Sequence, residues 1–222
     1  MTRLLALLTV AVLALAGCGA DEPEQQRPVL LLPGYGGSTA DLMDLADALE
    51  AEGRTAVLVP LASAGTDDLR DQVELVAAAA DGESVDVVGF SAGGLVARLW
   101  VADGGDAHRV VTLATPHHGT DLVLGVENCP PACQQLGPDS DVITELNAGD
   151  ETPDGTEWTT IWSELDDAVQ PPESAQLEGA QDVLVQDVCP GLAITHADTP
   201  GDPAVIAMVL DVLAGDEPDV DC

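Results

Sequence analysis

The stretch "VDVVGFSAGGLVAR", residues 85–98, changes from a strand pattern to a helix pattern within a few residues. Its first five residues are strand-like, and the residues after Ser91 are typical of a helix. Ser91 lies at the turn between Gly89 and Gly93, in the pattern G-x-S-x-G. Glycines at these two positions would let a strained turn hold the serine Oγ clear of the strand. The alternative interpretation makes Ser91 a helix N-cap with packing glycines.

Strand-like and helix-like segments alternate along the rest of the chain. Residues 116–156 are the least regular part, and no internal repeat is present. The expected strands are 29–33, 55–60, 85–89, 109–115, 158–162 and 182–188, and the expected helices are 39–53, 67–82, the segment after Ser91, 139–149 and 202–215. Near-continuous Val and Leu runs that alternate with helices predict an α/β fold, with a mainly parallel central sheet flanked by helices on both faces.

The composition predicts an apolar core and a very acidic surface. The 222 residues include 40 Asp plus Glu and only six basic residues, all Arg, for a formal net charge of −34. Hydrophobic residues make up 46% and aromatic residues 2%, so the core must be built from Ala, Val and Leu. The charge argues against nucleic acid or an anionic lipid surface as a partner. The length after a leader predicts one domain, residues 29–222.

The N-terminus carries an export pattern. Arg3 precedes an apolar run that is too short to span a bilayer, so residues 1–17 are expected to be a signal peptide. The ending "LAGC" resembles a bacterial lipobox, in which Cys18 would become the lipidated first residue. Residues 18–28 would then tether the domain to the membrane. We expect a cell-surface lipoprotein or a secreted protein, and the alternative is an ordinary signal peptide cleaved near this point.

Cysteine parity agrees with the lipobox. The chain has five cysteines, and four remain if Cys18 carries lipid. Four cysteines outside the cytosol allow three disulfide pairings. The short "CPPAC" loop favours a bridge between Cys129 and Cys133, which leaves Cys189 to pair with Cys222. The CxxxC spacing argues against a zinc site, and no metal site is expected.

Four stretches together resemble the small bacterial triacylglycerol lipases of the α/β-hydrolase superfamily, over roughly residues 29–199. They are "LLLPGYGG" (30–37), "VVGFSAGGLVAR" (87–98), "VVTLATPHHGTD" (110–121) and "LNAGDETPDGTEWTTIWSELDDAVQPP" (146–172). The resemblance implies an α/β-hydrolase fold with an oxyanion hole made by the backbone NH groups of Tyr35 and Ala92. The chain departs from many relatives by having Pro33-Gly34 in place of His-Gly, and Phe90 in place of a histidine before the serine.

The order of a hydrolase triad selects the acid and the base. In this superfamily the chain order is Ser, then Asp or Glu, then His, and His196 alone follows every candidate acid. The stretch "SELDDAVQPP" resembles the family pattern S-x-x-D-x-x-V-x-P, which selects Asp166. Asp167 and Glu164 remain alternatives for the acid. His117 and His118 are expected to line the cleft or hold the loop after residue 115.

These residues predict a serine hydrolase that cleaves carboxylic esters through an acyl-enzyme, without a metal or an organic cofactor. The resemblance favours acylglycerols as the substrate. We also expect a monomer that contacts the membrane through an N-terminal lipid anchor. A carboxylesterase or a polyester or cutin hydrolase would use the same residues. The alternative from another class is a non-catalytic surface lipoprotein that keeps the fold as a binding module.

Overall fold

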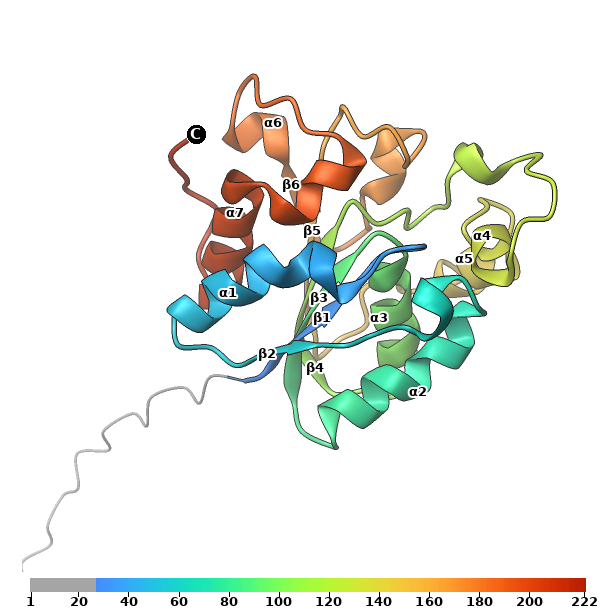
Figure 1. The fold of residues 1–222 in the computed structure, drawn as a ribbon, viewed down its shortest axis with the longest axis horizontal. Helices are drawn as coiled ribbons and strands as arrows, with labels where there is room; N and C mark the ends of the chain where they lie inside the picture. Colours follow the sequence, from blue (N-terminus) through green and yellow to red (C-terminus); the bar gives the residue numbers. More distant parts are fainter. Residues whose placement is uncertain (1–26) are drawn as a thin grey trace, which may run out of the picture.

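A single parallel sheet organises the chain in the computed structural model, which describes residues 27–222 (Figure 1). Six strands lie in the order β2-β1-β3-β4-β5-β6, and every neighbouring pair is parallel. Their bounds are β1 Val29–Leu32, β2 Ala56–Leu58, β3 Val85–Phe90, β4 Ala107–Leu113, β5 Glu157–Trp162 and β6 Gln181–Leu184. Because the strands are parallel, the turns that follow them gather at one edge of the sheet, where ligand sites of α/β folds form.

Helices cover both faces of the sheet. On one face lie α2 (Leu69–Ala80), α3 (Ala92–Ala102), α4 (Pro131–Gln135) and α5 (Asp141–Leu146), and on the other lie α1 (Met43–Ala51) and α7 (Pro203–Ala214) (Figure 1). The remaining elements are α6 (Val185–Val188) and five 3-10 turns: η1 Thr39–Leu42, η2 Ala62–Gly65, η3 Asp121–Val123, η4 Pro172–Ala175 and η5 His196–Gly201.

Alternation of side chains along the central strands supplies one core to each face. In β3, Val85 and Val87 pack with α2 and α3, whereas Val88 and Phe90 pack with α1 and α7. All six residues of β3 are buried. Burial of small aliphatic side chains on both faces is the main stabilising contribution available to so acidic a chain. The predicted α/β class, with helices on both faces, is confirmed.

One predicted strand is shorter than expected. The expected strand at 182–188 pairs with β5 only as far as Leu184, which lies opposite Trp162, the last residue of β5. Beyond that point an edge strand has no partner for its backbone groups, and the chain turns into α6 instead. Helix α4 lies inside the irregular region 116–156, where the sequence pattern predicted only one helix, at 139–149, and α5 occupies part of that range.

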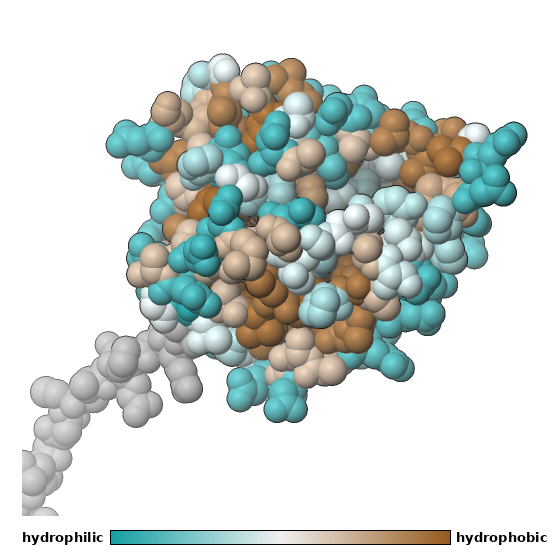
Figure 2. Space-filling view, in the orientation of Figure 1, coloured by the Kyte–Doolittle hydropathy of each residue, from teal (hydrophilic) through white to brown (hydrophobic). Residues whose placement is uncertain are grey.

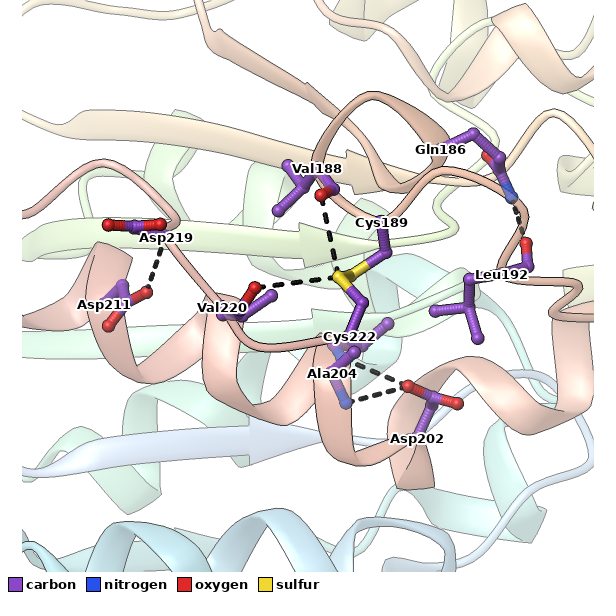
Figure 3. Close-up of a disulfide and its surroundings, with 11 residues drawn as sticks. Gln186, Val188, Cys189, Leu192, Asp202, Ala204, Asp211, Asp219, Val220 and Cys222 are labelled. Carbon is purple, nitrogen blue, oxygen red and sulfur yellow. Dashed lines mark hydrogen bonds between the residues drawn. A yellow bond between two sulfur atoms is a disulfide. The ribbon is translucent and has the colours of Figure 1, made fainter.

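Two disulfides lie in the second half of the domain. Cys129 is bonded to Cys133 across 4 residues, and Cys189 to Cys222 across 33 residues. Both bridges join the cysteines favoured by the sequence. In Figure 3 the second bridge fastens the end of the chain beside α7, next to the segment of Leu192 that leads toward η5.

The expected signal peptide, Cys18 and nearly all of the tether at 18–28 lie outside the described residues. Among residues 27–222, none of the helices is both long and apolar enough to traverse a bilayer.

Candidate active site

Ser91 sits in a sharp turn between β3 and α3. Its backbone angles are φ 53° and ψ −122°, a region that residues with a Cβ rarely adopt. The turn is held because Ser91 N donates to Leu113 O at 2.8 Å and Gly94 N donates to Ser91 O at 3.0 Å. The serine is therefore fixed by the backbone at the end of the sheet, and its side chain does not cap α3.

Three glycines make this turn sterically possible. A Cβ at Gly89 would lie 2.6 Å from Gly94 Cα, and one at Gly93 would lie 2.4 Å from Leu32 O. A Cβ at Gly94 would lie 2.0 Å from Thr115 Oγ1, so this third glycine is as constrained as the two in the motif. The close approach of α3 to β1, to β3 and to Thr115 after β4 thus requires glycine at each position.

Ser91, His196 and Asp166 form one continuous hydrogen-bonded array. Ser91 Oγ lies 3.0 Å from His196 Nε2, and His196 Nδ1 lies 2.8 Å from Asp166 Oδ2. Ser91 is 7% exposed and Asp166 5% exposed, whereas the His196 side chain keeps 16% of its surface. In the sequence, Ser91 is 105 residues from His196, and Asp166 is 30 residues from it. The fold therefore brings three of the predicted side chains together from distant loops.

Asp166 and Asp167 make different contacts with His196. The second oxygen of Asp166, Oδ1, accepts backbone NH groups from Ala168 at 2.8 Å and Val169 at 2.7 Å. These bonds fix the carboxylate so that only Oδ2 faces the imidazole. Asp167 Oδ1 instead accepts the backbone NH of His196 at 3.1 Å. The adjacent carboxylate thus holds the backbone of the base without contacting its ring.

The loop of Asp166 is clamped to the loop that follows β4. Thr120 Oγ1 donates to Ala168 O at 2.8 Å and accepts from Gln170 N at 3.0 Å, and Asp121 N donates to Gln170 O at 2.7 Å. Thr120 is 4% exposed, so losing its hydroxyl would leave buried backbone groups unpaired. The position of Asp166 therefore depends on a residue 46 positions away.

The turn after β1 lies against the serine. A Cβ at Gly34 would lie 3.0 Å from Ser91 Cβ, which brings the next residue, Tyr35, close to the serine. Ala92 is the first residue of α3, and the first NH groups of a helix have no partner within it. These are the two positions expected to supply the oxyanion hole.

Phe90 packs against His196. Its ring centroid lies 5.0 Å from that of His196, with a tilted arrangement. The residue that departs from the lipase pattern therefore forms an apolar wall beside the imidazole. This contact is one of the features that the sequence did not reveal.

The other three histidines lie outside the array. His117 is fully buried, with Nε2 2.9 Å from Thr112 Oγ1 and its backbone carbonyl accepting from Asn147 Nδ2. It holds the loop after β4 and does not line a cleft. His118 Nε2 lies 3.1 Å from Glu151 Oε1. His108 Nδ1 lies 3.2 Å from Asp86 Oδ1, beside the start of β3.

Exposed apolar side chains gather on the segments that build the site. Tyr35 belongs to the turn after β1, Leu165 precedes Asp166, and three more lie on the loop tied to Thr120. The large hydrophobic side chains exposed among residues 27–222 are Tyr35, Met43, Leu122, Leu124, Val126 and Leu165. Figure 2 shows apolar surface over the loop after β4, beside hydrophilic residues. Single exposed apolar residues are ordinary, but a contiguous group of them marks a surface that contacts a partner, a membrane or a ligand.

Within the described part of the chain, no group of three or more His, Cys, Asp and Glu side chains is placed to hold a metal ion.

The sequence matches the palmitoyl protein thioesterase family over residues 28–165, more than half of the chain. The chain belongs to the palmitoyl protein thioesterase family. The matched region contains the Ser91 turn and ends one residue before Asp166. No curated protein sequence matches the chain. The predicted resemblance to lipases and esterases of the α/β-hydrolase superfamily is confirmed, and so is the expected serine hydrolase acting on carboxylic ester bonds.

Solved structures agree with this family. Lipase B of Aspergillus fumigatus superposes with a TM-score of 0.76 at 25% identity, covering 88% of this chain and 54% of the fungal one. Carboxylesterase CesB of Bacillus subtilis superposes with a TM-score of 0.54 at 15% identity over 87% of this chain and 85% of its own. Phospholipase PlaB of Legionella pneumophila gives 0.51 at 18% identity, over 60% and 38%. The chain thus spans about half of the fungal lipase and less of the phospholipase. The α/β-hydrolase fold is confirmed.

Proposed function

We propose that this protein is a serine hydrolase that cleaves carboxylic esters of apolar acyl groups. The observation that carries the proposal is the array in which Ser91 Oγ, the His196 ring and Asp166 Oδ2 are joined at 3.0 and 2.8 Å. A serine is a weak nucleophile until a base accepts its proton, and the base needs a carboxylate to fix its tautomer. The array supplies the nucleophile, the base and the carboxylate within hydrogen-bond distance of one another.

The first half of the reaction forms an acyl-enzyme. Ser91 Oγ attacks the ester carbonyl carbon while His196 Nε2 takes the hydroxyl proton, and the carbonyl oxygen becomes an oxyanion. His196 Nδ1–H donates a hydrogen bond to Asp166 Oδ2, and this carboxylate stabilises the imidazolium. When the tetrahedral intermediate collapses, the bond to the alcohol oxygen breaks and His196 gives its proton to that oxygen. Water then repeats the sequence and releases the acid.

The oxyanion is assigned to the backbone NH groups of Tyr35 and Ala92. Gly34 packs against Ser91, and Ala92 begins α3, whose positive dipole end faces the turn. Backbone donors aimed at the oxyanion stabilise the transition state more than the ground state. The replacement of a lipase histidine by Pro33 leaves the Tyr35 NH available because a backbone donor does not depend on that side chain.

We assign acylglycerols as the first substrate class. The exposed apolar side chains beside the site and the likeness to the fungal lipase favour a long acyl chain over a small polar ester. A second candidate is a fatty acyl thioester, which the palmitoyl protein thioesterase match favours. Both reactions use the same acyl-enzyme, because they differ only in the leaving group.

The decisive experiment is covalent labelling by a fluorophosphonate. We expect the wild-type protein to be labelled at Ser91 and the Ser91→Ala variant to remain unlabelled. Absence of labelling in the folded wild-type protein would leave a non-catalytic binding module as the function. Rates on p-nitrophenyl esters of increasing acyl length, on acylglycerols and on a palmitoyl thioester then rank the substrate classes. A preference for short acyl chains would favour a carboxylesterase.

We also propose export of a monomer anchored by lipid at Cys18. The "LAGC" pattern and the two disulfides support this, since disulfides persist outside the cytosol. Cys18→Ser should move the protein out of the membrane fraction. An unmodified N-terminus by mass spectrometry, with unchanged fractionation, would contradict the anchor.

A further inference from the structure

A run of three left-handed residues lies in the loop between β2 and α2. Ser63 has φ 51° and ψ 36°, Ala64 has φ 54° and ψ 37°, and Gly65 has φ 69°. Two of the three carry a Cβ, which makes this conformation unfavourable, and consecutive residues of this hand are uncommon. Such a conformation persists only where neighbouring contacts hold it. We call Ser63–Gly65 the left-handed run.

The left-handed run lies against the turn that contains Tyr35. Gly36 N donates to Ala64 O at 2.8 Å. A Cβ at Gly65 would lie 3.1 Å from Gly34 O, so the run contacts the residues on both sides of Tyr35. In a right-handed turn the Ala64 carbonyl would point elsewhere, and Gly36 would lose its acceptor. The unusual hand is therefore what directs this carbonyl to the turn after β1.

The run is itself held from two directions. Gln72 on α2 is completely buried, and its Oε1 accepts the backbone NH of Ala62 at 2.7 Å. Thr66, which follows the run, donates through Oγ1 to Ser63 O at 2.7 Å and accepts Ala132 N at 3.2 Å through its own carbonyl. The run is thereby fixed to α2 and to α4. A buried glutamine is costly to keep without a partner, and its bond to this loop accounts for its place in the core.

We propose that the left-handed run is a positioning segment, which directs the backbone NH of Tyr35 toward the oxyanion formed at Ser91. This inference rests on the proposed ester hydrolysis. An oxyanion donor acts only when its hydrogen reaches the place where charge develops, and the run contacts both neighbours of that donor. Loss of its position should weaken binding of the transition state and leave ground-state binding of the ester nearly unchanged.

The test is Gly65→Ala, with Gly82→Ala as the matched control. Both glycines have positive φ, 69° and 78°, so both substitutions put a Cβ on a left-handed residue and introduce a similar kind of backbone strain. The new Cβ meets Gly34 O at residue 65, whereas nothing lies within 4 Å of it at residue 82. The difference between the two variants isolates the push on the turn after β1. We expect Gly65→Ala to lower kcat on a soluble p-nitrophenyl ester about ten- to hundredfold, with KM nearly unchanged.

The second readout is inhibition by a trifluoromethyl ketone. Ser91 Oγ adds to the carbonyl carbon of the ketone, and the resulting hemiketal places its oxyanion in the oxyanion hole. Its inhibition constant should rise for Gly65→Ala in parallel with the loss of kcat, and should stay at the wild-type value for Gly82→Ala. A merely structural role would change the two variants alike. An unchanged ketone inhibition constant in folded Gly65→Ala, or equal losses in both variants, would overturn the proposal.

If Gly65→Ala does not fold, Gln72→Met applies the same test. Methionine fills the buried position but cannot accept the Ala62 NH, so the run loosens without a steric push. Weaker ketone inhibition at unchanged KM supports the proposal, and wild-type inhibition overturns it. Fluorophosphonate labelling of the wild-type protein separates this result from the proposed function. A wild-type protein that is folded but unlabelled refutes ester hydrolysis, whereas labelling with an unaffected Gly65→Ala variant refutes the positioning role alone.

Discussion

The part of the site around Ser91, the serine half, is built from backbone contacts between neighbouring elements. The part that contains Asp166 and His196, called the acid and base half after their proposed roles, is built from hydrogen bonds between loops far apart in the sequence. Around Ser91, three glycines let α3 approach β1, β3 and Thr115 to distances that no side chain would allow. Asp166 and His196 instead depend on polar contacts from Ala168, Val169, Thr120 and Asp167. The first half is fixed by steric exclusion and the second by bonds that can be removed one at a time.

This difference predicts unequal responses to mutation. Steric exclusion cannot relax without moving a strand, so changes near Ser91 should affect both fold and activity. Hydrogen bonds in loops can be lost with the fold intact. Changes around Asp166 and His196 should therefore lower the activity by different amounts without unfolding the protein. The two halves meet at one contact, the 3.0 Å bond between Ser91 Oγ and His196 Nε2.

The largest effect is expected at that contact. Ser91→Ala and His196→Ala should each lower kcat by about 10⁶-fold, as in a comparable protease triad, because either change abolishes the same proton-coupled attack. The double variant should be little worse than either single variant. The measurement is kcat on a soluble p-nitrophenyl ester. Losses that multiply in the double variant would show that the two residues act separately, and full activity of Ser91→Ala would end the enzyme assignment.

The sequence predicts the serine half well because the requirements there are local. A strand pattern, a glycine on each side of Ser91 and a helix pattern lie within 14 residues, and steric rules connect them. The third glycine, Gly94, is visible in the same stretch, but its contact with Thr115 is not. Parallel strands buried on both faces are equally legible as Val and Leu runs.

The acid and base half is only partly legible. Chain order and family likeness select Asp166 and His196, but the clamp by Thr120 joins residues 48 and 50 positions apart, which no local pattern encodes. The same is true of Phe90 beside His196 and of Gln72 beneath the left-handed run. Helix α6 escaped prediction because its residues read as a strand, and only the end of β5 shows that no pairing partner remains.

The second largest effect separates the two adjacent carboxylates. Asp166→Asn should fold normally and lower kcat about 10⁴-fold, because an amide in place of the carboxylate favours the wrong imidazole tautomer. Asp167→Asn should keep most activity, because the amide oxygen can still accept the His196 backbone NH. Asp167→Ala, which cannot accept it, sharpens the contrast and should be the less active of the two. Steady-state kinetics and circular dichroism check all three variants, and the opposite order for the two Asn variants would exchange the roles of the carboxylates.

The third effect concerns the disulfides, which support the two halves unequally. Replacing both Cys189 and Cys222 by Ser opens a loop of 33 residues beside the segment that leads to His196, and should lower the free energy of unfolding by about 3 to 4 kcal/mol. Replacing Cys129 and Cys133 releases only 4 residues, and should cost about 2 kcal/mol. Urea denaturation measures both. We also expect the first pair to lower kcat more than the second, since its bridge lies nearer the base. Peptide mapping that finds Cys133 bonded to Cys189 would overturn the pairing.

The smallest effect is a pH dependence of the free energy of unfolding that originates at His117, in the loop after β4. Burial lowers the pKa of His117 well below 6.5, and the positive charges of Arg98 and His118 lower it further. In the unfolded chain His117 binds a proton below about pH 6.5, while in the folded protein it stays neutral. Unfolding therefore takes up a proton in this window, and its free energy falls with decreasing pH by up to about 1.4 kcal/mol per unit.

His117→Gln tests this pH dependence because an amide does not titrate and can still reach Thr112. Urea denaturation at pH 7.5 and pH 5.5 should show a smaller loss of stability in the variant than in the wild-type protein. All other ionisable groups are common to both proteins, so the difference between their losses reports His117. Equal losses would mean that His117 is protonated in the folded state. A larger loss in the wild-type protein than in His117→Gln would assign this part of the acid sensitivity to the buried, neutral His117 in the loop after β4.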